Sequence, residues 1–160
     1  SPEEFNALDD NLVMSVQPTH ATSDMYWAED RLGAERVKGA YAYKTLLNKT
    51  GKLALGTDYP VENVSPFYTF YAAVARKDLE QFPENGFQKK DALTREETLK
   101  GMTLWAAYSN FEEKEKGSIT AGKMADFVIL EEDIMTIEED KIPNVKVNAT
   151  YVGGKKVYQP

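Results

Sequence analysis

The apolar positions in the first part of the chain follow two alternating patterns. Two short apolar runs, residues 12–16 and 52–56, predict strands buried on both faces. Apolar residues at helical spacing follow each run, over residues 30–48 and again from Pro66 onward. The order strand, helix, strand, helix predicts a parallel βαβα unit whose helices cover the sheet.

Local capping signals predict where two of the helices begin. Ser65 followed by Pro66 is a favourable N-cap with proline at the first helical position. Thr94 and Glu97 have the spacing of a capping box and predict another helix that runs to about Asn110. Both helix starts are therefore expected on local chemistry, in addition to the apolar pattern.

The pattern changes near residue 112, where glycine turns begin to separate strand-like segments. Gly153-Gly154 predicts a two-residue hairpin loop between two of these segments. The segments rich in β-branched and aromatic residues are 126–130, 145–152 and 155–158. We expect a small antiparallel sheet here, and a division of the chain into residues 1–112 and 113–160.

A polar residue with catalytic potential follows each predicted parallel strand. His20 lies a few residues beyond the first, and Asp58 lies just past the second, where Gly56 permits a sharp exit. If the strands are neighbours, both side chains face one pocket, because the carboxyl ends of parallel strands meet at one edge. On this stretch alone, the simpler interpretation of Asp58 is a turn residue bonded to its own loop backbone.

Composition narrows the possible functions. The net charge of −7 argues against sequence-independent binding to nucleic acid. No apolar run has the length of a membrane span, and the N-terminal SPEEFNALDD lacks the features of a signal peptide, so no membrane partner is expected. Zero cysteines exclude disulfides and are consistent with a cytoplasmic protein. With His20 as the single histidine, a complete zinc site within these residues is not expected.

Several motifs together resemble a known family. They are QPTH at 17–20, GTDYPV at 56–61, TREETLKGMTLWAAYSNF at 94–111, KGSITAGKMADFVIL at 116–130 and TYVGGKKVY at 150–158. With these motifs, the chain resembles the C-terminal portion of amidohydrolase-superfamily enzymes, in particular the YtcJ-like metal-dependent hydrolases. The resemblance extends from about residue 10 to the end.

The resemblance implies an α/β fold built from two parts. Residues 11–80 would be the last two β/α units of a TIM-type (β/α)8 barrel, and residues 117–160 the C-terminal strands of a small β-sandwich, the composite domain of metallo-hydrolases. Family members hydrolyse C–N bonds other than peptide bonds, in amides, formamides or cyclic amides. They use one or two divalent metals, and zinc is the ion we expect.

The resemblance also changes the interpretation of the candidate residues. Asp58 matches the aspartate after the eighth strand, which binds or abuts the metal and handles the proton of the attacking water, so we now favour a catalytic and metal-binding role. His20 matches no metal ligand of the family; it is expected either to contact substrate and shape the pocket or to be a structural loop histidine. Three neighbours could line the same pocket or serve only in capping and solvation: Asp24, Trp27 and Arg31.

The remaining ligands of the family are absent and would lie upstream of Ser1, so we expect this chain alone to be inactive. Its expected partners are a small-molecule amide-type substrate, the missing N-terminal part of the same enzyme and a possible second copy in a homo-oligomer. The alternative is a non-catalytic α/β binding or oligomerisation domain. Two β/α units cannot close a barrel, so their strand edges and apolar helix faces need a cover.

Overall fold

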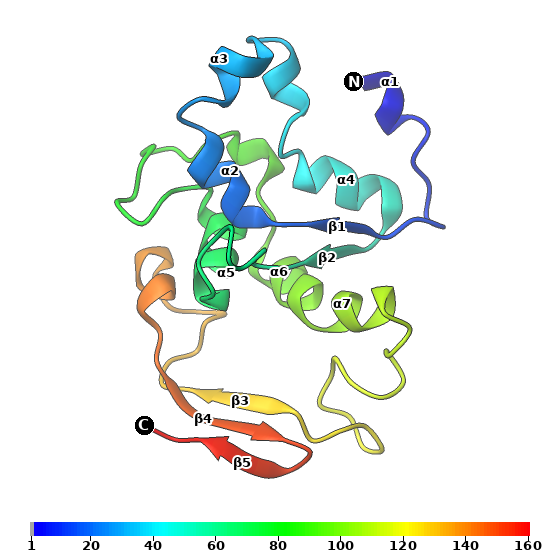
Figure 1. Ribbon diagram of the computed structural model, residues 1–160, viewed down its shortest axis with the longest axis vertical. Helices are drawn as coiled ribbons and strands as arrows, with labels where there is room; N and C mark the ends of the chain where they lie inside the picture. Colours follow the sequence, from blue (N-terminus) through cyan, green and yellow to red (C-terminus); the bar gives the residue numbers. More distant parts are fainter. Residues whose placement is uncertain (1) are drawn as a thin grey trace.

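Two short parallel strands lie at the centre of the first region in the computed structural model, which describes residues 2–160 (Figure 1). β1 (Met14–Val16) pairs with β2 (Leu53–Leu55) in parallel, with Met14 opposite Leu53 and Val16 opposite Leu55. The predicted parallel pair is confirmed. All of β2 is buried, but Ser15 of β1 is exposed, so the prediction that the first strand is buried on both faces is wrong.

Short helices surround this strand pair, with α4 on one side and α6 and α7 on the other (Figure 1). The helices are α1 (Pro2–Phe5), α2 (Pro18–Asp24), α3 (Ala28–Leu32), α4 (Tyr43–Thr50), α5 (Pro66–Ala75), α6 (Arg95–Met102) and α7 (Leu104–Ser109). Three 3-10 turns are η1 (Arg36–Gly39), η2 (Lys89–Asp91) and η3 (Glu139–Asn144). None of the helices within residues 2–160 combines the length and the apolar character needed to cross a bilayer.

The buried apolar residues form two clusters. The first lies around β2 and consists of Ala21, Tyr43, Leu47, Leu53, Leu55, Ala73 and Leu93. The second joins α5 to the segment after β3 and consists of Phe70, Tyr71, Val74, Ala75, Ile134 and Ile142. α5 starts at Pro66, as predicted, and carries residues of both clusters. Ser65 stands at the N-cap position, but its side chain makes no capping hydrogen bond there.

The single helix predicted over residues 30–48 is wrong. α3 ends at Gly33, whose φ of 80° places it outside the helical region, and η1 ends at Gly39. α4 begins only at Tyr43. Val37 and Leu47 are nevertheless buried, because the separate turns keep these apolar residues directed at the core.

The helix predicted from Thr94 to about Asn110 begins as expected and then divides. Glu97 N–H donates to Thr94 Oγ1 at 3.1 Å and Thr94 N–H donates to Glu97 Oε2 at 2.8 Å, which confirms the capping box. The division occurs at Thr103, whose hydroxyl donates at 2.6 Å to the carbonyl of Leu99. That carbonyl would bond the N–H of Thr103 in a continuous helix.

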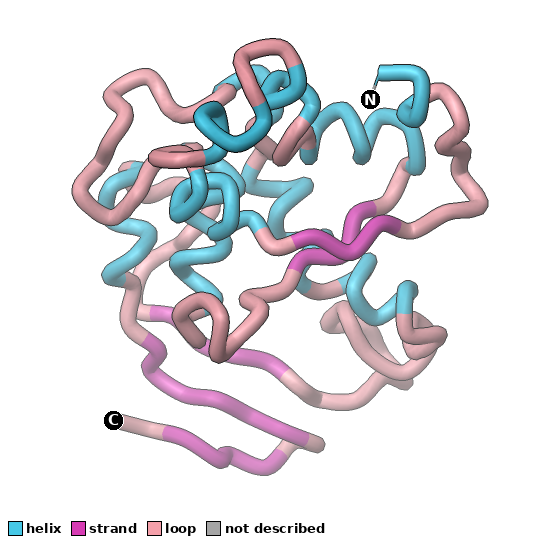
Figure 2. The backbone as a smooth tube through the Cα atoms, turned by 45° about the horizontal axis from the view of Figure 1, so that its top comes forward, coloured by secondary structure: helices cyan, strands magenta, loops and turns pink. Residues whose placement is uncertain are grey.

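The second region is a three-stranded antiparallel sheet, as predicted (Figure 2). Its strands are β3 (Phe127–Leu130), β4 (Val147–Val152) and β5 (Lys155–Tyr158), in the order β3-β4-β5. Gly153 and Gly154 both have positive φ, as a tight hairpin turn requires, and Gly153 N–H donates to Asp126 Oδ1 at 2.6 Å. The division between residues 112 and 113 stays a prediction, and η3 packs on α5 across it.

Gly101 allows α6 to lie directly on β2. A Cβ at this position would lie 2.6 Å from Leu55 Cγ and 2.9 Å from Leu53 O. We expect Gly101→Ala to lower the free energy of unfolding by about 2 kcal/mol through overpacking, measured by urea denaturation. Gly39→Ala is the control, because its Cβ would meet only Phe5 Cε2 at 3.7 Å. Equal stability of the two variants would contradict this account of the packing.

The capping glutamate makes part of the stability depend on pH. Burial raises the pKa of Glu97, but hydrogen bonds from Lys44 and Thr94 outweigh this and hold the pKa below its ordinary value of 4.5. The charged form therefore stabilises the fold above about pH 4.5, and the contribution is lost as pH falls through the folded-state pKa. We expect Glu97→Gln to unfold about 1 kcal/mol more easily at pH 7, with a difference that shrinks in acid.

Urea denaturation of both proteins between pH 7 and pH 3 measures this difference. Glu96→Gln is the matched control, because Glu96 lies on the same turn and its exposed side chain pairs with Lys100 at 2.6 Å. Its effect is expected to be small at every pH. A Glu97→Gln effect of the same size across the whole range would show that the charge of Glu97 is not responsible.

Candidate functional site

The candidate site lies where β1 and β2 end. Pro18 starts α2 directly after β1, which places His20 in the first turn of this helix. The chain leaves β2 through Gly56, whose N–H still donates to Val16 O at 3.1 Å. The sharp turn comes at Asp58, with a φ of 59°, so the prediction that Gly56 makes the sharp exit is wrong. Aspartate tolerates this left-handed conformation better than most residues.

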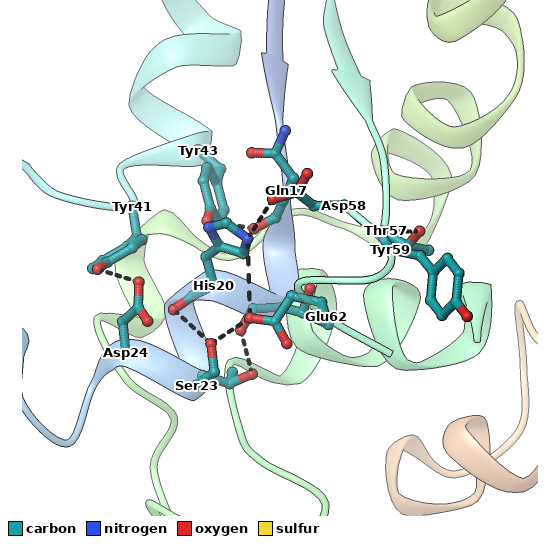
Figure 3. A network of polar contacts seen from close by, with 12 residues as sticks. Gln17, His20, Ser23, Asp24, Tyr41, Tyr43, Thr57, Asp58, Tyr59 and Glu62 are labelled. Carbon is teal, nitrogen blue, oxygen red and sulfur yellow. Dashed lines mark hydrogen bonds and ion pairs between the residues drawn. The ribbon is translucent and has the colours of Figure 1, made fainter. Parts of the chain in front are cut away.

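The parallel pairing brings His20 and Asp58 together. His20 Nε2 lies 3.2 Å from Asp58 Oδ2 and 4.0 Å from Glu62 Oε1 (Figure 3). The Nε2 atom is buried and has no hydrogen bond of good geometry within residues 2–160. Ser23 Oγ donates to Glu62 Oε1 at 2.6 Å. The loops after both strands therefore contribute to one polar cluster, which consists of His20, Ser23, Asp58 and Glu62.

The Asp58 carboxylate is not used to stabilise its own loop. The loop is closed instead by the Asp58 carbonyl, which accepts the N–H groups of Val61 at 2.8 Å and Glu62 at 3.3 Å. Across the described residues, no backbone N–H of the loop donates to the carboxylate. Its side chain is 42% exposed. The carboxylate can therefore face both His20 and a small molecule.

The structure does not bring the other predicted site residues into this cluster. Asp24 Oδ2 accepts the hydroxyl of Tyr41 at 2.8 Å. Trp27 is 48% exposed, and Arg31 is also exposed, on the short helix that follows. The substrate-binding role of Asp24, Trp27 and Arg31 stays a prediction.

Sequence reasoning missed two members of the polar cluster. Ser23 lies one helical turn after His20, so an i, i+3 search on α2 would have found it. Glu62 comes four residues after Asp58, and only the left-handed turn at Asp58 brings it back toward α2. The sequence indicates a turn near Asp58, but not that this turn brings Glu62 toward α2.

Clefts flank the polar cluster on two sides. One of about 250 Å³ is lined by His20, Gln17, Tyr41 and Tyr43, among others. Another of about 300 Å³ is lined by Ser23, Glu62 and Tyr26, among others. A larger apolar cleft of about 810 Å³ lies elsewhere, between α6–α7 and the sheet of β3 and β4. One cleft thus gives a small ligand access to His20, and the other gives access to Ser23 and Glu62.

Tyrosines around the clefts keep their hydroxyl protons. Burial and then the hydrogen bond to Asp24 raise the pKa of Tyr41. The hydrogen bond to Asp78 is the main cause that raises the pKa of Tyr26 to about 12. Burial raises the pKa of Tyr43, against a smaller opposing effect of the Arg76 charge. These hydroxyls therefore act as neutral hydrogen-bond donors.

The donors present fit only part of a metal's coordination shell. Within residues 2–160, no three histidine, cysteine, aspartate or glutamate side chains are arranged to hold an ion. The Asp58 carboxylate and the unbonded Nε2 of His20 are donor types that zinc accepts. A catalytic zinc usually has at least three protein ligands, so further ones would have to come from outside these residues.

Comparison with known proteins shows the family of the chain. Residues 7–158 match the model of the amidohydrolase family. The chain belongs to the amidohydrolase family. The amidohydrolase YtcJ of Bacillus subtilis (strain 168) is 32% identical over 148 residues, which are 92% of this chain and 28% of YtcJ. The resemblance to YtcJ-like amidohydrolases, predicted from the sequence motifs, is confirmed.

Two further proteins are similar to this chain, one in sequence and one in its solved structure. The N-substituted formamide deformylase of Arthrobacter pascens is 28% identical over 119 residues, which are 74% of this chain and 21% of that enzyme. The crystal structure of a metal-dependent hydrolase from Pyrococcus horikoshii OT3 superimposes with a TM-score of 0.69 at 30% identity. It covers 80% of this chain and 26% of that one. The chain thus spans roughly a quarter of the relatives it matches.

The left-handed backbone at Asp58 predicts a difference between two substitutions there. Asn tolerates this conformation, whereas Ala is disfavoured in it by about 1 kcal/mol. We expect Asp58→Asn to keep the stability of the parent protein and Asp58→Ala to lose about 1 kcal/mol in urea denaturation. Equal losses in both variants would mean that the carboxylate, and not the backbone, sets the stability at this position.

Proposed function

We propose that this chain contributes Asp58 and part of the pocket wall to a metal-dependent hydrolase of C–N bonds other than peptide bonds. Candidate substrates are amides, formamides and cyclic amides. The observation that carries the proposal is the 3.2 Å approach of His20 Nε2 to Asp58 Oδ2 at the carboxyl edge of the parallel strands. Family membership and the similarity to a formamide deformylase support the reaction class.

Asp58 is the proposed proton carrier. Water adds to the carbonyl carbon, and its proton passes to the Asp58 carboxylate. Asp58 then returns the proton to the nitrogen as the C–N bond breaks, which leaves a carboxylic acid and an amine. A bound divalent metal would lower the pKa of the attacking water. His20 and Glu62 lie beside Asp58 and would orient the substrate around it.

Asp58 would also hold the metal, for which we propose zinc, through a carboxylate oxygen. His20, with its unbonded Nε2, is the nearest side chain for contact with the substrate. Asp24 would line the neighbouring cleft through its contact with Tyr41. Trp27, at the start of α3, and Arg31, within α3, are proposed as outer substrate contacts.

The rest of the site is proposed to come from a preceding part of the same enzyme. That part would complete the (β/α)8 barrel and the β-sandwich and supply the missing metal ligands. Without these ligands, this chain is expected to be inactive by itself. The absence of cysteine supports a cytoplasmic location. The apolar 810 Å³ cleft also favours a second function class, in which the chain is a binding or oligomerisation domain, as a homo-oligomer for example.

The test uses the protein extended to the length of its relatives. Asp58→Asn is expected to lower hydrolysis of N-substituted formamides and cyclic amides by at least about 100-fold, because it removes the proton acceptor. Release of amine measures the rate, and elemental mass spectrometry measures bound zinc. Asp10→Asn, an exposed aspartate in the loop before β1, is the control.

Undiminished hydrolysis by Asp58→Asn would contradict the proposed role of Asp58. Absence of both metal and hydrolysis in the extended parent protein would favour the binding domain instead.

A further inference from the structure

A buried arginine, Arg76, lies at the end of α5. Arg76 follows the last residue of α5 with a left-handed φ of 59°, and its side chain is fully buried. Its Nε donates to the carbonyl of Phe87 at 2.9 Å, and the N–H of Phe87 donates to the carbonyl of Arg76 at 2.7 Å. The end of α5 and the loop before η2 are thus fixed to each other.

The Arg76 guanidinium is compensated by aromatic rings. Its carbon Cζ lies 5.0 Å from the ring centre of Tyr43 and 5.8 Å from that of Phe87. Both terminal nitrogens lack a hydrogen-bond partner within residues 2–160. The Nε bond leaves both terminal nitrogens uncompensated, and the attraction to the two ring faces, which is stronger for a desolvated cation, stabilises the charge. The ring of Tyr43 is therefore held in one position.

The hydroxyl of Tyr43 reaches the turn that carries His20. It donates to the carbonyl of Gln17 at 3.0 Å, and the same carbonyl accepts the backbone N–H of His20 at 3.1 Å. Gln17 precedes α2 and provides no side-chain cap for it. Figure 3 shows Tyr43, Gln17 and His20 side by side. The start of α2 is therefore tied to α4 through this one hydroxyl.

A second contact fixes the turn that presents Tyr43. The buried Asp91 accepts the N–H of Thr45 at 3.2 Å and its hydroxyl at 2.8 Å, both on Oδ1. Thr45 lies in the first turn of α4, two residues after Tyr43. Arg76 thus contacts the ring of Tyr43, and Asp91 fixes the helical turn on which Tyr43 lies.

We propose that Tyr43, held by Arg76, is a positioning residue that sets the orientation of His20 toward Asp58 through the Gln17 carbonyl. The inference rests on the proposed function for its catalytic meaning. The effect of Tyr43 on the orientation of His20 is measured on the imidazole itself, without metal or substrate. The positioning by Tyr43 and the proposed hydrolase function can therefore fail separately.

The experiment records the ring ¹H–¹⁵N correlations of histidine in ¹⁵N-labelled protein, with the His20 signal assigned by its loss in His20→Gln. Tyr43→Phe keeps the ring over Arg76 and removes the hydroxyl. We expect the ring signals of His20 to shift and broaden while the melting temperature stays within a few degrees. Thr45→Val, which loosens the same turn, is expected to shift them less and in the same direction.

Tyr108→Phe is the matched control. Tyr108 lies on α7, and its ring centre is 4.7 Å from Lys52 Nζ. Lys52 directly precedes β2, whereas Asp58 follows the other end of this strand. Tyr108→Phe is expected to leave the His20 signals unchanged. Unchanged signals in a folded Tyr43→Phe, or equal changes in Tyr108→Phe, would overturn the proposal. Shifted His20 signals, together with a lack of hydrolysis by the protein extended to the length of its relatives, would leave the positioning intact and overturn only its catalytic meaning.

Discussion

The parallel pairing of β1 and β2 is the constraint on which the candidate site depends. Val16 lies opposite Leu55, so the segments that follow both strands leave the sheet at the same edge. α2 then places His20 one turn away, and the left-handed backbone at Asp58 turns the carboxylate toward it. A shift of one residue in this register would reverse the side-chain directions of a strand and separate the pair.

Packing behind the strands keeps this geometry rigid. On one side, α6 approaches β2 so closely that position 101 has room only for glycine. On the other side, α4 is held by its contacts to Gln17 and Asp91, both of which are made by residues of its first turn. Polar residues of the cluster therefore sit at the edge of a tightly packed unit, an arrangement that suits a site whose side chains must keep fixed distances.

Features set by neighbouring residues were predictable, and those set by distant contacts were not. The capping box at Thr94, the start of α5 and the Gly153-Gly154 hairpin each depend on residues close in sequence, and all appear as predicted. The break at Thr103 lies at a residue with a non-helical backbone, φ −129° and ψ −84°, which the spacing of apolar residues does not encode. The place of Glu62 depends on one positive φ, which the pattern of apolar residues does not encode.

The contact between η3 and α5 determines how the chain can be divided. The buried face of α5 packs against Ile134 and Ile142, and the guanidinium of Arg95 donates to the carbonyls of Ile134 and Ile137. These partners belong to the connection between β3 and β4, beyond residue 112. Contacts therefore cross the predicted boundary between residues 112 and 113. A chain shortened there would expose the apolar face of α5 that Ile134 and Ile142 cover.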